Sequence, residues 1–207
     1  MKTSIFGETV TDVNELKDMA GIPSKLAANK VISFLDKHCK EFICCTPFIT
    51  IATQSSTGGD VSPRGDAPGF IQVLDDHHLL IPERPGNKRM DSLINLLENP
   101  NIGLLLMIPG REEALRINGK ASIVKDKTLL EQCEYKGKTP LLGIGVEVKE
   151  CYIHCAKAFK RSYLFEPERW PSTEGLAPAA RMLSDHAKIG EEKVIESLKE
   201  SYTKRLY

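Results

Sequence analysis

Closely spaced runs of strand length, separated by turn residues, are the feature that most limits how this chain can fold. Residues 102–108 are almost entirely apolar, Pro109 and Gly110 form a turn signal, and residues 114–124 alternate between apolar and polar side chains. Strict alternation is typical of a strand with one buried face. Comparable runs lie at 42–46, 48–53 and 144–148. Many strands joined by short turns, with few helices between them, favour an antiparallel barrel over a parallel sheet.

Helical patterns lie mostly outside this strand-rich region. Asp12 followed by Glu15 predicts a short helix, and Ser24 is placed to cap a second helix whose apolar face reaches Leu35. Shorter helical patterns follow at 90–97, 127–134 and 154–161, and two terminal helices are expected within 179–198. We therefore expect a mainly β protein with flanking helices (α+β), consisting of an N-terminal helical extension at 1–40, a barrel at 41–165, and a C-terminal loop with helices at 166–207 packed on the same domain.

A hairpin in the middle of the chain carries the first functional signal. Residues 69–80 predict two short apolar strands joined by an Asp-Asp turn, which brings the flanking segments 61–66 and 81–89 together. The polar groups of these segments include Arg64, Arg84, Asn87 and Arg89. Arginine presents a rigid fork of donors that matches phosphate oxygens, so an anionic ligand such as a phosphate is the hypothesis. The alternative is that the arginines only form surface ion pairs with Asp60, Asp66, Glu83 and Asp91.

Charge balance excludes several classes of partner. The 28 Lys and Arg residues equal the 28 Asp and Glu residues, so no global positive field exists to hold nucleic acid or an anionic membrane. No apolar run approaches the roughly 20 residues of a membrane span, and residues 1–10 lack the apolar core of a signal peptide. We expect a cytoplasmic protein whose anion site is local.

Six cysteines in such a chain are expected to be reduced and mostly small apolar fillers. Cys151, His154 and Cys155 form a cluster that suggests zinc, but a structural zinc site needs four ligands. A nucleophilic Cys155 activated by His154 is disfavoured because adjacent residues point in different directions. The interpretation favoured here is buried cysteines beside a capping or interface histidine, with no metal.

Several motifs in register resemble the pyridoxamine 5'-phosphate oxidase-like family, in a branch distinct from the true oxidases. They lie at 48–53, 61–66, 68–70, 81–89, 99–100, 108–110 and 115–119, and the resemblance covers roughly residues 40 to 165. It implies an FMN-binding split barrel, a six-stranded antiparallel Greek-key barrel that forms a homodimer and holds FMN at the subunit interface.

The resemblance also implies which residues bind the cofactor. The family places its phosphate contacts at the start of a helix, here Asn87, Lys88 and Arg89. A helix N-terminus offers free N–H groups and a positive dipole end, which agrees with this placement. The full set of expected FMN contacts is Ile51, Ala52, Thr53, Ser62, Pro63, Arg64, Ile81, Pro82, Arg84, Asn87, Lys88, Arg89 and Arg116.

The chain departs from the true oxidases after Leu164. Where those enzymes carry an Arg and His set that grips pyridoxal phosphate, this chain has Arg169, Trp170 and terminal helices. We therefore expect flavin redox chemistry on another small-molecule substrate or electron donor, with little turnover of pyridoxamine 5'-phosphate. The substrate side is assigned to His154, Lys157 and Arg161.

Two other functions remain open at this point. One is a non-enzymatic flavin or haem binding or storage protein, in which His154 would be the axial ligand of the haem. The other is a deazaflavin-dependent reductase on the same barrel. The absorption spectrum of the purified protein separates flavin from haem.

Overall fold

The computed structural model describes residues 5–207, which fall into two compact units that divide after Val31. The first unit contains α1 (Val13–Ala20) and α2 (Lys25–Asn29). The carboxylate of Asp12 accepts hydrogen bonds from the first turn of α1, and Ser24 Oγ accepts one from the first turn of α2. Both predicted N-caps are confirmed.

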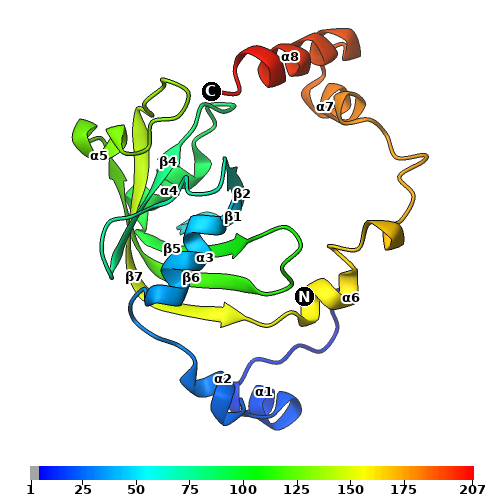
Figure 1. Cartoon of the computed structure of the whole chain (residues 1–207). Coiled ribbons are helices and arrows are strands. Elements are labelled where there is room, and N and C mark those ends of the chain that lie inside the picture. Colours follow the sequence, from blue (N-terminus) through cyan, green and yellow to red (C-terminus); the bar gives the residue numbers. More distant parts are fainter. Residues whose placement is uncertain (1–4) are drawn as a thin grey trace. The chain divides into compact units, whose positions relative to one another are not determined.

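The second unit carries the sheet and the remaining helices (Figure 1). Its elements are α3 (Lys37–Cys45), β1 (Phe48–Ser55), β2 (Gly58–Gly65), β3 (Gln72–Val73), β4 (His78–Glu83), α4 (Asp91–Glu98), β5 (Asn101–Met107), β6 (Ala114–Val124), α5 (Lys127–Glu131), β7 (Leu142–His154), α6 (Lys157–Ser162), a 3-10 helix (Pro167–Arg169), α7 (Ala179–Ala187) and α8 (Glu191–Lys204).

Within residues 5–207, seven strands form one antiparallel sheet in the order β2-β1-β5-β6-β7-β4-β3. β4 precedes the β5-β6-β7 meander in sequence but pairs with its last strand, which is a Greek-key order. The predicted class, mainly β with an antiparallel sheet and flanking helices, is confirmed.

The predicted number of strands and the predicted closed barrel are not confirmed. The additional strand is β3, which has two residues and pairs only with β4. Together with β4 it forms the hairpin predicted within residues 69–80. The strand order also leaves β2 and β3 as unpaired edges in the described chain, so the hydrogen-bonded sheet is open.

One hydrophobic core fills the inner side of the sheet. It combines alternate residues of the strands with one face of α3 and one face of α4. The alternation is clear on β1 and β5, where Ile49, Ile51, Leu104 and Leu106 are at most 2% exposed. The intervening side chains of these strands point to the opposite side and form the outer face of the sheet.

The predicted strand at 42–46 is wrong, because Phe42 and Ile43 belong to α3. The Asp36 carboxylate accepts a 2.8 Å hydrogen bond from the backbone N–H of Cys39, which caps the helix. The buried residues Cys39, Phe42 and Ile43 follow a helical spacing, whereas Cys44 and Cys45 are exposed. The apolar run therefore contains one helix face, which a strand-length window cannot distinguish from a buried strand.

The second predicted helix is shorter than expected. α2 ends at Asn29, and the chain then becomes extended, since Ile32 pairs with Cys151 in an isolated bridge. Leu35, expected on the face of that helix, is instead part of the core of the second unit. The predicted helices after residue 90 are confirmed as α4, α5, α6, α7 and α8, with shifted ends.

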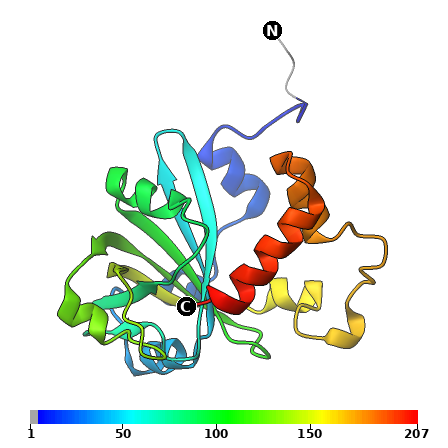
Figure 2. The ribbon, with the colours of Figure 1, turned by 90° about the horizontal axis from the view of Figure 1, so that it is seen from above.

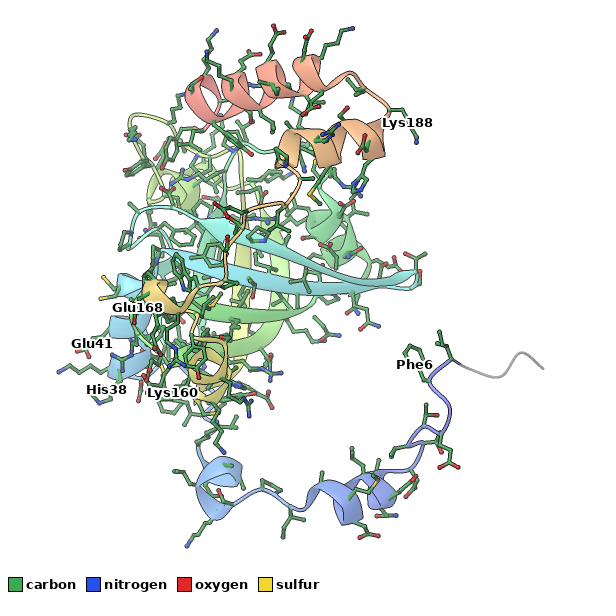
Figure 3. All side chains as sticks on the ribbon, turned by 90° about the vertical axis from the view of Figure 1, so that its right-hand side faces the viewer. Phe6, His38, Glu41, Lys160, Glu168 and Lys188 are labelled. Atoms are coloured by element: carbon green, nitrogen blue, oxygen red, sulfur yellow. The ribbon has the colours of Figure 1, made fainter. Side chains whose placement is uncertain are left out.

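The two terminal helices pack on each other as a hairpin. α7 ends at Ala187, and its C-cap residue Lys188 has a left-handed φ of 57° and marks the turn in Figure 3. α8 then leads back to the sheet, and the end of the chain lies beside the strands in Figure 2.

No helix within residues 5–207 is long and apolar enough to cross a membrane.

Candidate functional site

A pocket of about 930 Å³ lies where four segments of the second unit converge. The segments are the second half of β2, the chain from the end of β4 to the first turn of α4, residues 138–142, and residues 206–207. Ligand pockets commonly have volumes of about 300 to 1,000 Å³, so the pocket has room for a cofactor.

Strand pairing brings these segments together. Glu83 at the end of β4 pairs with Leu142 at the start of β7, so the loops that follow and precede these strands lie side by side. The hydroxyl groups of Ser62 on β2 and Ser92 on α4 share a hydrogen bond of 2.7 Å, which joins β2 to the start of α4. The pocket is therefore assembled by the sheet and not by one continuous motif.

The loop from β4 to α4 has an unusual backbone. Lys88 has a φ of 62° and Met90 a φ of 58°, in the left-handed region that side chains other than glycine rarely adopt. Residues held in such conformations tend to cluster at ligand clamps and other functional sites. Met90 also begins α4 without a side-chain cap, so the N-terminal end of that helix is exposed to the pocket.

Positive charge exceeds negative charge around the pocket. Among residues 5–207, five cationic side chains line it, and they are Arg64, Arg84, Lys88, Arg89 and Lys138. The lining carboxylates of Asp60, Glu83 and Asp91, with the buried carboxylate of Asp66 that pairs with Arg84, leave an excess of one positive charge. This excess favours an anionic ligand such as a phosphate monoester.

Two of the arginines are held in shielded ion pairs. Arg64 Nε donates to Glu83 Oε2 at 2.8 Å, and the two side chains are 17% and 25% exposed. Arg84 Nε donates to Asp66 Oδ2 at 2.7 Å, where Asp66 is only 1% exposed. The predicted alternative of arginine–carboxylate pairs is thus realised in part, but these pairs lie in the pocket wall and not on an open surface.

Arg89 is different because it is exposed. Its Nε donates to Asp91 Oδ2 at 2.7 Å, and its side chain is 73% accessible. The hydrogen bond from Arg89 to Asp91, together with the charge of that carboxylate, raises the pKa of Arg89. The amide oxygen of Asn87 accepts from the Arg89 N–H at 3.0 Å, so part of the Asn87 side chain shapes the loop.

A chain of hydrogen bonds runs along the pocket wall. Arg64 donates from a terminal nitrogen to Ser62 Oγ at 2.9 Å, and Ser92 Oγ donates to Asp60 Oδ2 at 2.8 Å. With the Ser62–Ser92 contact, these bonds connect Arg64 to Asp60 through two hydroxyls. Ser92 is 3% exposed, so the network fixes the position of α4 against β2.

The structure places eight of the thirteen expected cofactor contacts in this pocket. They are Ser62, Pro63, Arg64, Pro82, Arg84, Asn87, Lys88 and Arg89.

The other five lie elsewhere in the described chain. Ile51, Thr53 and Ile81 are buried on the inner side of the sheet. Ala52 and Arg116 are exposed on the outer face, where the Arg116 guanidinium lies 5.6 Å from the ring centroid of Tyr152. The strand pattern therefore directs these side chains away from the pocket.

The expected substrate side is also distant from the pocket within one subunit. Leu142 lines the pocket at the start of β7, whereas His154 ends that strand twelve residues later. At about 3.3 Å per residue this is on the order of 40 Å of strand. Lys157 and Arg161 follow on α6, which Figure 1 shows at the opposite end of the unit from the C-terminus. Their role toward a ligand stays a prediction.

The cysteine and histidine cluster does not gather its side chains. Cys151 is fully buried, and its Sγ lies 3.3 Å from Cys39 Sγ on α3. The contact with Cys39 and burial raise the pKa of Cys151. Cys155 is exposed, and the buried Nδ1 of His154 has no hydrogen-bond partner among residues 5–207.

Several contributors to the pocket are not predicted by the sequence patterns, among them Ser92, Lys138 and Tyr207. Lys138 and Tyr207 lie far from the arginine-rich loop in the sequence, and Ser92 appeared only as part of a helix. The signal that could have found Ser92 is its place in the first turn after the predicted phosphate loop. Nothing local marks Lys138 or Tyr207, because β-sheet pairing and the return of α8 bring them into the pocket.

Comparisons with known proteins identify similar chains. The profile of the family described as pyridoxamine 5'-phosphate oxidase matches residues 35–155, more than half of the chain. No curated protein sequence matches.

Several solved structures resemble this one. HupZ from Group A Streptococcus is 18% identical, with a TM-score of 0.45 and coverage of 57% of this chain and 92% of that chain. An FMN-binding protein from Syntrophomonas wolfei is 11% identical, with a TM-score of 0.41 and coverage of 52% and 76%. A FAD-binding protein from Mesorhizobium loti is 14% identical, with a TM-score of 0.38 and coverage of 60% and 99%.

Proposed function

Since the chain belongs to the pyridoxamine 5'-phosphate oxidase family, we propose that it is a flavoprotein that binds FMN in the pocket and acts as an oxidoreductase on a small molecule or electron donor. The observation that carries the proposal is the set of five cationic side chains that line a pocket of about 930 Å³. FMN combines a phosphate with a planar ring, and the pocket has a cationic side and an apolar side to receive them.

The cationic side would hold the phosphate. Lys88 and Arg89 stand on the loop before α4, and the uncapped N-terminus of α4 adds backbone N–H groups and a positive dipole end. Arg89 is 73% exposed and forms an ion pair with Asp91, a contact that an incoming phosphate can compete with. This donor set fits a terminal phosphate.

The two shielded arginines, Arg64 and Arg84, would bind the flavin ring. Arg64 and Arg84 are oriented by Glu83 and Asp66 through Nε. One terminal nitrogen of Arg64 also donates to Ser62 Oγ and to the main-chain oxygen of Pro63, so its other terminal nitrogen would be the donor to a ligand. Bound flavin supplies the electron transfer, and the protein supplies binding, orientation and a positive charge that favours the reduced anionic ring. Ser62 and Ser92 keep β2 and α4 at a constant separation.

A second copy of the chain is part of this proposal. The outer face of β2, β1 and β5 carries apolar side chains in adjacent registers, such as Val61 beside Ala52, which is beside Gly103. Val61 is 70% exposed and Phe48 is 40% exposed. Contiguous apolar patches of this kind mark protein contacts. A homodimer through this face would also place Ala52 and Arg116 of the outer face close to the partner subunit.

Binding of flavins to the purified protein tests the proposal. FMN should bind more tightly than riboflavin by roughly 2 to 4 kcal/mol, or about 30- to 1,000-fold, because only FMN engages the cationic loop. Fluorescence titrations with FMN, riboflavin and FAD measure this difference, and an absorption spectrum with added haem tests the haem alternative. Equal affinity for FMN and riboflavin, or a haem spectrum without flavin binding, would contradict the proposal.

A further inference from the structure

The last two residues of the sequence, Leu206 and Tyr207, line the same pocket as the arginine-rich loop. α8 ends at Lys204, and the chain then turns toward the end of β4, where Figure 1 marks the C-terminus. Tyr207 is thus brought beside residues that precede it by more than 100 positions. Neither the sequence motifs nor the predicted phosphate site accounts for this arrangement.

Tyr207 is fixed at both ends. Its phenol donates to Asp66 Oδ1 at 2.9 Å, and its main-chain oxygen accepts from Lys138 Nζ at 2.6 Å. Asp66 is 1% exposed and holds Arg84 with its other oxygen, so one buried carboxylate orients both a pocket arginine and the tyrosine. The hydrogen bond to Asp66 raises the pKa of Tyr207, which keeps the phenol protonated.

The ring of Tyr207 belongs to an aromatic and cationic cluster. Its centroid lies 5.0 Å from that of Tyr135, with an angle of 43° between the rings, and Lys136 Nζ lies 4.7 Å from the Tyr207 centroid. Such contacts hold a ring in one orientation without burying it completely. The ring therefore has one side packed on Tyr135 and remains part of the pocket lining.

Tyr207 lines the pocket and does not fill it. The volume of about 930 Å³ is what remains with Tyr207 and Leu206 in place. Beside them, Leu141 is 90% exposed and Leu206 is 58% exposed, although both are large apolar side chains. Apolar side chains that are exposed at a pocket rim indicate a surface that a ligand covers.

We propose that Tyr207, with Leu206 and Leu141, forms the surface that receives the planar ring of the ligand, and that Tyr207 is a positioning residue held by Asp66. The inference rests on the proposed flavin site and adds the ring-binding side to the phosphate side. The pocket then has two separable halves: a loop that recognises phosphate and a wall that recognises an aromatic ring.

Two flavins separate these halves. FMN and riboflavin share the ring, but only FMN carries the phosphate. Tyr207→Ala should weaken the binding of both by a similar factor, roughly 3- to 10-fold, because the lost contact is with the ring. It should also raise the fluorescence of the bound flavin, since a nearby electron-rich phenol quenches an oxidised flavin. Tyr202→Ala is the matched control, because Tyr202 stands on the helix that leads to Tyr207 and is 67% exposed outside the pocket.

A second variant separates the ring from its hydrogen bond. Tyr207→Phe keeps the ring and removes the bond to Asp66, so its dissociation constant for riboflavin should lie between those of the wild type and Tyr207→Ala. Thermal unfolding of each ligand-free variant verifies that the fold is retained. A constant for Tyr207→Phe equal to that for Tyr207→Ala would assign the effect to the hydrogen bond and overturn the ring contact.

Failure of the two proposals gives different results. If the wild type binds neither FMN nor riboflavin, the flavin site itself is overturned together with the ring wall. If the wild type binds FMN, but Tyr207→Ala leaves both affinity and fluorescence unchanged or tightens binding, only the role of Tyr207 is overturned.

Discussion

Arg64, Arg84 and Arg89 each donate from Nε to a carboxylate, but their surroundings give them different roles. The first two side chains are 17% and 15% exposed, and the third is 73% exposed. Breaking a buried ion pair leaves an uncompensated charge and is strongly destabilising, whereas an exposed pair contributes about 0 to 1 kcal/mol. Arg84 is therefore needed for the fold of the pocket, and Arg89 is available to a ligand.

Removal of Arg89 should thus affect binding and not folding. We expect Arg89→Ala to weaken FMN by about 2 to 4 kcal/mol, because a charge-assisted contact with the phosphate is lost, and to leave riboflavin binding unchanged. Fluorescence titration measures both constants. Arg181→Ala, at an exposed position on α7, is the control. An FMN affinity identical to that of the wild type would remove Arg89 from the site.

At the scale of elements, the pairing of β6 with β7 connects the pocket to the rest of the sheet, because β7 leads from the pocket to the far end of the sheet. The register shifts between Asn118 and Gly119, which is a β-bulge. Gly119 sits where its strand approaches β7 closely: a Cβ there would lie 2.3 Å from the main-chain oxygen of Glu147 and 3.0 Å from a methyl of Val146. The bulge therefore requires glycine for space and not for a left-handed backbone.

Substitution of this glycine should be costly. We expect Gly119→Ala to lower the free energy of unfolding by roughly 3 kcal/mol, the upper end of the usual overpacking cost, because the clash is with a backbone atom of a central strand. The urea midpoint of unfolding measures the change. Gly59→Ala on β2 is the control, since the nearest atom to its Cβ would be 3.9 Å away, and it should change stability by less than about 1 kcal/mol. Similar midpoints for both variants would contradict this account of the bulge.

At the scale of the whole molecule, one side of the sheet is filled by the core and the other is the outer face described above. Its residues Ala52 and Val61 are exposed, and Leu105 and Met107 are only partly covered. These side chains alternate with buried ones, so the outer face is apolar without being part of the core. An apolar sheet face of this kind is expected to be covered by a second subunit.

A charge on this face should disrupt the proposed dimer. We expect the wild type to sediment as a dimer at micromolar concentration and Val61→Glu to shift toward monomer, because an unpaired carboxylate would be desolvated in the interface. Leu97→Glu is the control, since Leu97 is 77% exposed on α4 and lies on neither the outer face nor the pocket lining. A monomeric wild type that binds FMN with full affinity would contradict the shared site.

Sequence patterns predicted most elements because their signals are local. Alternation identified β6 with its observed bounds, and capping residues identified the starts of α1 and α2. The segment at 42–46 was misassigned because short apolar runs look alike in a helix and in a buried strand. The hairpin predicted within residues 69–80 is confirmed as β3 and β4, because an Asp-Asp turn between two apolar runs is also a local signal.

Local sequence patterns were enough to predict the strand-rich class, the family and the arginine-rich loop around Arg89, since each depends on residues that are close together in the chain. Tertiary structure alone decided which of the expected contacts share a pocket. Strand pairing turns Ile51 and Ile81 into the core, and the pairing of Glu83 with Leu142 brings the segment that contains Lys138 to the pocket. The return of α8 adds Tyr207 from the far end of the sequence. These outcomes depend on long-range packing, because burial and pairing energies are summed over the whole sheet and no short segment contains them.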